Sequence, residues 1–139
     1  VKAVDFFLGV MSTDRRPDEI LTTIELPAQT SNDAWAFHEL SRRHGDFALV
    51  GVAATARRRS EGLEELRLVV FGCEERPRIS KIAASSSLSQ KDALELASAV
   101  AEDLDPMSDL EGDAKTKRIQ ARTLIQRALD DLFVEGVNG

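Results

Sequence analysis

A ten-residue, almost uninterrupted apolar run from Phe47 to Ala56 limits what this chain can fold into more than any other stretch of its sequence. The run is rich in small and branched residues and is typical of a strand that is buried on both faces. A charged corner, Ser41 to Asp46, precedes it and ends in a Gly-Asp pair that favours a turn. Because side chains at the end of a buried strand have fixed positions, Arg42, Arg43 and Asp46 form either a structural ion-pair corner or a site for an anionic group.

Strand patterns fill the first half of the chain and helix patterns the second, which predicts an α+β fold rather than alternating βαβ units. We expect strands over residues 20–26, where alternate residues favour one buried face, and over 34–40, 48–57 and 63–72. The link between the last two is short enough to make them an antiparallel hairpin. The prediction is a four-stranded antiparallel sheet.

Three helices are expected to follow the sheet and to pack on one of its faces. The first is short and lies around residues 79–83, where the period of the apolar residues changes after a proline. The second begins at a Ser89 cap, with an aspartate three residues later, and extends to Leu104 before an Asp-Pro pair. The third begins at an Asp113 cap and has an inward face that repeats at three-to-four spacing as far as Leu132.

Composition excludes several classes of protein. At 139 residues the chain has the size of a single domain, and its net charge of −6 argues against a nucleic-acid binder. One cysteine, Cys73, provides neither an internal disulfide nor the four ligands of an iron–sulfur cluster, and it is compatible with a cytoplasmic or other reducing setting. No apolar stretch approaches the roughly 20 residues of a transmembrane segment.

Residues for independent catalysis are scarce. His38 and His44 are six positions apart, which does not match the spacing of helical zinc sites, and we expect no metal site. A lone cysteine after a strand, here Cys73, is more often a packing residue than a nucleophile. The glycines form no G-x-G, so a phosphate-binding glycine loop is missing from this sequence. No catalytic residue is predicted.

Four stretches together resemble a known family, the C-terminal domain of the FAD-binding medium subunit of molybdenum hydroxylases, which includes carbon monoxide dehydrogenase and xanthine dehydrogenase relatives. The first stretch, Trp35 to Ala54, has an aromatic residue followed by Ser-Arg-Arg and Gly-Asp, and the second, Asp5 to Pro27, leads from Asp-Phe-Phe-x-Gly to Leu-Pro. The third is a glycine loop with Pro-x-Arg, at Gly72, Pro77 and Arg78. The fourth contains Asp-Pro, Asp, Gly-x-Ala and Arg-Ala-Leu, at Asp105, Pro106, Asp109, Gly112, Ala114 and Arg127 to Leu129. One departure is Thr116-Lys117, where relatives usually carry Tyr-Arg.

The resemblance implies an oxidoreductase component and a division of labour. Substrate would be oxidised at a molybdenum cofactor in a large subunit, and electrons would pass through 2Fe-2S clusters in a small subunit to FAD in the medium subunit. Residues 1–139 would be one domain of that medium subunit, closing one side of the flavin site. The family's FAD-binding region lies upstream of the matched part, so we expect this chain alone to bind FAD weakly or not at all.

The resemblance also implies flavin-side residues. By position, Gly72, Arg78 and Ile79 in the second charged loop would lie near the flavin, although Arg78 could equally bond the carbonyls of its turn. For Arg42 and Asp46 we expect an arginine–carboxylate pair that locks the hairpin, with any cofactor role indirect. The alternative function is a non-enzymatic α+β module that binds a partner protein through the open face or the edge of its sheet.

Overall fold

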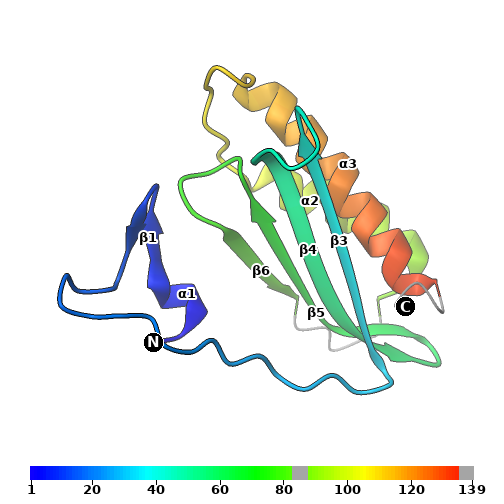
Figure 1. Ribbon diagram of the computed structural model, residues 1–139. Helices are drawn as coiled ribbons and strands as arrows, with labels where there is room; N and C mark the ends of the chain where they lie inside the picture. The colour runs from blue at the N-terminus through cyan, green and yellow to red at the C-terminus, as the bar shows by residue number, and fades with distance from the viewer. Residues whose placement is uncertain (83–87, 135–139) are drawn as a thin grey trace.

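The computed structural model describes residues 1–82 and 88–134 and confirms an α+β fold built on a four-stranded antiparallel sheet (Figure 1). The strands follow one another across the sheet in chain order: β3 (Asp33–Ser41), β4 (Ala48–Arg59), β5 (Gly62–Phe71) and β6 (Arg78–Ile82). The predicted hairpin between the long central strands is confirmed. Its turn is two residues, Ser60 and Glu61, with Arg59 opposite Gly62.

The predicted strand over residues 20–26 is wrong. This segment is extended but pairs with no other strand among the described residues, and Ile20 and Leu26 are each 84% exposed. The alternation of its apolar residues is suited to a strand, but a strand also needs a neighbour that offers free N–H and C=O groups. In this chain the segment runs below the sheet between the N-terminal part and β3 (Figure 1).

The predicted short helix around residues 79–83 is also wrong, because Arg78–Ile82 is the edge strand β6. It pairs with β5, with Ile79 opposite Val69 and Ser80 opposite Leu68. Periodicity alone does not distinguish a helix from a strand in a short segment with isoleucines three apart. Residues 78–82 form a strand because the edge of β5 is free to pair with them. Ala83 and the serine run that was expected to break the helix lie outside the described residues.

Both longer helices begin where their caps predict. At α2 (Gln90–Glu102), Ser89 and Asp92 form a capping box, and at α3 (Ala114–Phe133) the Asp113 side chain accepts a hydrogen bond from the Thr116 backbone N–H at 2.6 Å. Helix α2 ends two residues before the predicted Leu104. No helix in the described part of the chain is long and apolar enough to span a membrane.

The packing of three helices on one face is not confirmed. Helix α3 lies across β3, β4 and β5, and α2 packs against α3 on the same side of the sheet (Figure 1). The short α1 (Ala3–Phe6) instead contacts β1 (Phe7–Gly9), which pairs with β2 (Ser12–Thr13) in a small hairpin. This N-terminal part lies beyond the β6 edge of the sheet, away from the two longer helices (Figure 1).

The core lies between the sheet and the two long helices. Alternate strand residues point into it, and small residues on the helices let the layers approach closely. Its members include Ala34, Ala36, Val50, Val52, Ala54, Leu66, Leu68 and Val70 from the sheet and Ala93, Ala97, Ala101, Ala121, Ile125, Ala128 and Leu132 from the helices. On α2 the larger Leu94 is exposed and the adjacent Ala93 is buried.

The central strand β4 is not fully buried on both faces as its apolar run predicted. Val50, Val52 and Ala54 are buried under the helices, whereas Ala53 on the opposite face is only half-buried and Thr55 is exposed. Helices cover one face of the sheet and leave the other open.

Candidate functional site

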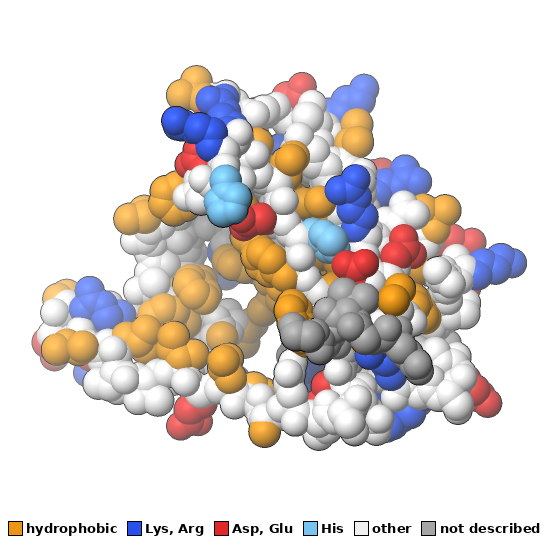
Figure 2. Space-filling view, turned by 45° about the vertical axis from the view of Figure 1, so that its right-hand side comes forward, with side chains coloured by type: hydrophobic (Ala, Val, Ile, Leu, Met, Phe, Trp, Pro, Cys, Tyr) orange, Lys and Arg blue, Asp and Glu red, His pale blue; other side chains and the backbone are white. Residues whose placement is uncertain are grey.

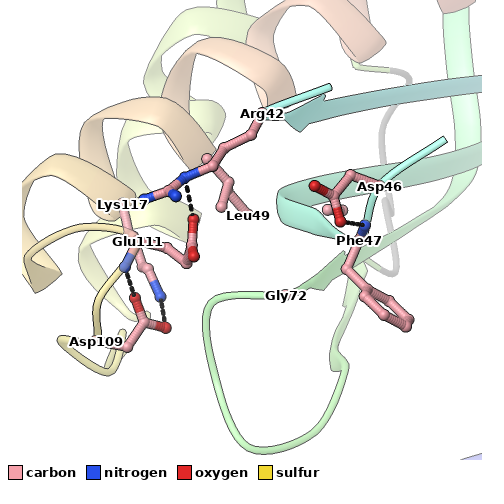
Figure 3. A pocket seen from close by; sticks show the side chains of 9 residues that line it. Arg42, Asp46, Phe47, Leu49, Gly72, Asp109, Glu111 and Lys117 are labelled. Atoms are coloured by element: carbon pink, nitrogen blue, oxygen red, sulfur yellow. Dashed lines mark hydrogen bonds and ion pairs between the residues drawn. The ribbon is translucent and has the colours of Figure 1, made fainter. Parts of the chain in front are cut away.

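A pocket of about 270 Å³ opens at the end of the sheet where the β3–β4 turn, the β5–β6 loop and the α2–α3 connection meet (Figure 3). It brings together three residues that the sequence predicted as site residues, namely Arg42, Asp46 and Gly72. Its other lining residues are Phe47, Ala48, Leu49, Asp109, Glu111 and Lys117. The predicted Arg78 and Ile79 lie in a second pocket.

The predicted ion pair between Arg42 and Asp46 is wrong. Arg42 instead pairs with the Glu111 carboxylate (Figure 3). It also donates to the Leu110 carbonyl oxygen at 3.3 Å. Asp46 accepts a hydrogen bond from the Phe47 backbone N–H at 2.9 Å, and its nearest guanidinium is that of the exposed Arg43, at 3.7 Å. The arginine therefore ties the β3–β4 turn to the α2–α3 connection and not to its own hairpin.

The most buried charge at this pocket was not predicted as a site residue. The Lys117 side chain is only 2% exposed, and its Nζ donates to Asp109 Oδ2 at 2.5 Å (Figure 3). This hydrogen bond, followed by one from the Glu111 backbone N–H, lowers the pKa of the Asp109 carboxyl. The three-to-four spacing of the buried α3 residues could have found it, because Lys117 lies four positions before Ala121.

Gly72 has a structural explanation in the backbone. Its φ is +84°, a left-handed conformation, and a Cβ there would lie 2.7 Å from the Ala48 carbonyl oxygen and 3.1 Å from that of Leu49. Only glycine lets the β5–β6 loop approach the start of β4 this closely. The next residue, Cys73, is buried, and burial raises the pKa of its thiol, which does not favour the nucleophilic thiolate.

A second pocket, of about 480 Å³, separates the N-terminal part from the β5–β6 loop. Arg78 lines it but donates two hydrogen bonds to the Glu74 carboxylate, at 3.0 and 3.1 Å, and these raise the pKa of Arg78. Arg78 is therefore bonded within its own loop, as one of its two predicted roles requires, but its acceptor is the Glu74 carboxylate and not backbone carbonyls. The other lining residues are Ala3, Val4, Asp5, Phe7, Arg76, Pro77 and Ile79.

Within residues 1–82 and 88–134, no group of three or more histidine, cysteine, aspartate and glutamate side chains is placed to hold a metal ion. His38 bonds through Nε2 to Asp131 Oδ2 at 2.8 Å and so links β3 to α3. Together the two pockets offer charged and apolar walls around a glycine-containing loop, and the described part of the chain contains no assembled catalytic set. The charged and apolar walls suit contact with a bound group.

Comparison with known proteins identifies the family. Residues 35–132 match the family described as CO dehydrogenase flavoprotein C-terminal domain. The chain is 28% identical over 136 residues to the glyceraldehyde dehydrogenase medium chain of Sulfolobus acidocaldarius, and the alignment covers 95% of this chain and 48% of that protein. It is 29% identical over 134 residues to the carbon monoxide dehydrogenase medium chain of Hydrogenophaga pseudoflava, and that alignment covers 94% of this chain and 47% of the relative.

The fold is also that of a solved relative. The carbon monoxide dehydrogenase structure from Hydrogenophaga pseudoflava superposes with a TM-score of 0.86 at 25% identity, over 94% of this chain and 47% of that one. The chain therefore belongs to the CO dehydrogenase flavoprotein C-terminal domain family, and the resemblance seen in its motifs is confirmed. It spans about half the length of the curated relatives it matches.

Proposed function

We propose that this chain is the C-terminal domain of the FAD-carrying, electron-transfer subunit of a molybdenum hydroxylase, where it closes one side of the flavin site. The observation that carries the proposal is the family match over residues 35–132, in a fold with a solved carbon monoxide dehydrogenase counterpart. The relatives named above act on different substrates, glyceraldehyde and carbon monoxide by their names, so the substrate is left unassigned.

The residues in hand fit the edge of a flavin and not its phosphates. The second pocket has an apolar lining from Val4, Phe7 and Ile79, suited to a planar ring, and it adjoins the positive charge of Arg78. The sequence contains no G-x-G loop with which backbone N–H groups cradle a pyrophosphate. A flavin-binding region upstream in the full-length subunit would supply that cradle, and the 139 residues would supply a wall.

When bound, FAD supplies the redox chemistry, and the task of this chain is to position and tune it. Ile79 would lie against the ring, and Arg78, held by Glu74, would set the charge beside it. Gly72 would act indirectly by fixing the path of the loop, since its closest contacts are to backbone atoms of β4. Arg42 and Asp46 would act one step further away, by holding the neighbouring turn.

The partners in this proposal are a large subunit with the molybdenum cofactor and a small subunit with 2Fe-2S clusters, in a cytoplasmic setting. Medium chains among the relatives support the general form of such an assembly. The rival function, a non-enzymatic interaction module, would use the same open sheet face but would leave the family match without an explanation.

Arg78 offers a test of the flavin-side assignment. In the full-length, FAD-loaded subunit, Arg78→Ala is expected to lower the flavin midpoint potential, because a nearby positive charge favours the anionic reduced ring. Arg58 provides a matched control, since it donates to the Leu132 and Val134 carbonyl oxygens at the end of α3 and lines neither pocket.

Arg58→Ala is expected to lower the melting temperature and leave the potential unchanged. If Arg78→Ala behaves in the same way, Arg78 only stabilises its turn, and the site assignment is wrong while the family stands.

A further inference from the structure

The face of the sheet opposite the helices carries an apolar row that crosses all four strands. Phe37 of β3 is paired with Ala53 of β4, Ala53 with Val69 of β5, and Val69 with Ile79 of β6. Side chains in register on neighbouring strands point to the same face. We call this surface, together with Trp35 and Phe71, the open face. Trp35 is 42% exposed and Phe37 52% exposed.

Two aromatic rings make the open face flat. The rings of Phe37 and Phe71 are stacked, with centroids 5.9 Å apart and planes at 26°. The Phe71 ring lies directly over Gly51, where a Cβ would come within 2.1 Å of it. A side chain at residue 51 would displace this ring, so glycine there permits a smooth aromatic surface.

Charged residues flank the apolar row on both sides along the strands. Arg67 of β5 lies opposite Thr55 on one side of the row, Glu39 of β3 lies opposite Gly51 on the other, and both are exposed. Arg57 pairs with Glu65 at 2.8 Å and lies 3.8 Å from Asp33, at the β4–β5 turn end of the sheet. An apolar centre with charged residues at its rim is the composition of a protein–protein contact and not of a solvated surface.

Further apolar residues are exposed near the sheet. The extended segment of residues 20–26 exposes Ile20, Leu21, Ile24 and Leu26 and has no partner strand among the described residues. Ile79 belongs both to the open face and to the pocket lined by α1 and β1. Figure 2 shows hydrophobic side chains gathered around the hollow between the N-terminal part and the rest of the molecule.

Two observations indicate what covers these residues. The chain accounts for 48% and 47% of the length of two relatives, so a subunit of their size has about as much polypeptide again. Its N terminus lies on the β6 side of the sheet, away from α2 and α3 (Figure 1), so polypeptide joined to it would leave from the side of the exposed segment and not of the helices.

We propose that the open face and residues 20–26 form the surface on which the flavin-binding region of the same subunit docks, with residues 20–26 adding a strand to that region. The inference rests on the proposed function and names the partner surface that completes the flavin site. Apolar contact with the open face positions the two halves, and backbone hydrogen bonds to the segment fix their register.

Hydroxyl-radical footprinting with mass spectrometry tests this on the full-length subunit and on the 139-residue chain. Oxidation of Trp35, Phe37 and the leucines of residues 20–26 is expected to fall several-fold in the full-length subunit. Leu94 and Ile119 on the helical side, 46% and 59% exposed, match the open-face aromatics in exposure and should react equally in both samples.

Equal oxidation of Trp35 and Phe37 in the two samples would overturn the docking surface, even if the full-length subunit carries flavin. Protection of these residues in the 139-residue chain at high concentration, together with a doubled mass by light scattering, would overturn it in favour of a second copy. The visible flavin absorbance of the full-length sample tests the proposed function separately.

A pair of variants adds a second readout. In the full-length subunit, Phe37→Asp should restore oxidation of residues 20–26, while Ile119→Asp, an equally drastic change on the helical side, should not. A segment that stays protected in folded Phe37→Asp would contradict docking through the open face.

Discussion

Among the described residues, Lys117 is the only one with a charged side chain that is buried. Such a group is costly to bury without a partner, and the Asp109 carboxylate, itself half-exposed, provides one. Helix α3 points this lysine at the connection that carries both Asp109 and Glu111, the partner of Arg42. Two ion pairs thus attach the α2–α3 connection, one to the helix and one to the β3–β4 turn.

The two partners of this pair should respond differently to substitution. Asp109→Asn leaves the buried ammonium without a carboxylate and is expected to lower the urea midpoint of unfolding. Lys117→Met has similar volume, leaves only the hydrated Asp109 unpaired, and should change the free energy of unfolding by less than about 1 kcal/mol.

In the double variant the midpoint should return to that of Lys117→Met alone. A midpoint for Asp109→Asn within error of the parent would show that the pair is not needed by the buried lysine.

The pH dependence of stability follows from carboxyls that accept hydrogen bonds in turns and caps. The pKa is lowered from the usual 3.8 for Asp33, Asp92, Asp109 and Asp113. A lowered folded-state pKa means that the unfolded chain binds more protons, so the contribution is complete above pH 3.8 and is lost as the pH falls through the folded values.

We therefore expect the melting temperature to fall steeply below about pH 4. In Asp109→Asn this acid-dependent loss should be smaller than in the parent. An identical pH profile would contradict the link between Asp109 and Lys117.

The sequence predicted only some of the contacts between the candidate site residues. Arg42, Asp46 and Gly72 share a pocket because the turns that carry them lie at one end of the sheet, as antiparallel strands in chain order dictate. The partner of Arg42 is Glu111, 69 positions along the chain, and local sequence patterns contain no information on such a contact. Asp46 was the nearer carboxylate in sequence and the wrong one.

At the scale of elements, the long patterns predicted well and the short ones did not. The β4–β5 hairpin and the caps of α2 and α3 were predictable because turn length and capping residues act locally. Residues 20–26 and 78–82 were misassigned because their states depend on whether a neighbouring edge is free to pair. The burial of β4 on both faces was wrongly predicted because an apolar run shows apolarity and not what covers it, although helices on one face of the sheet had been expected.

Gly45 and Gly72 form a matched pair that separates backbone strain from steric contact. Both have positive φ, +81° and +84°, but a Cβ at Gly45 meets nothing within 4 Å while one at Gly72 meets the Ala48 carbonyl oxygen at 2.7 Å. Gly45→Ala should cost about 1 to 2 kcal/mol of stability from conformation alone. Gly72→Ala should cost clearly more in the same denaturation experiment, and equal losses would contradict the close approach of the β5–β6 loop to β4.

At the scale of the whole molecule, the described residues form one buried core and leave many apolar side chains exposed. The helices bury one face of the sheet, while the open face, residues 20–26 and the pocket beside α1 expose apolar side chains. Motif order along the sequence was enough to indicate the family, and the chain spans about half the length of the relatives it matches.

FAD retention after gel filtration, read as visible flavin absorbance per mole of protein, tests the central claim most directly. The full-length subunit is expected to elute with about one flavin per chain. The 139-residue chain incubated with excess FAD is expected to elute colourless, because its sequence contains no G-x-G loop to cradle the phosphates. A full-length subunit that stays colourless with excess FAD would contradict the proposed function. A stoichiometric flavin spectrum from the 139 residues alone would contradict the division of the flavin site between two regions.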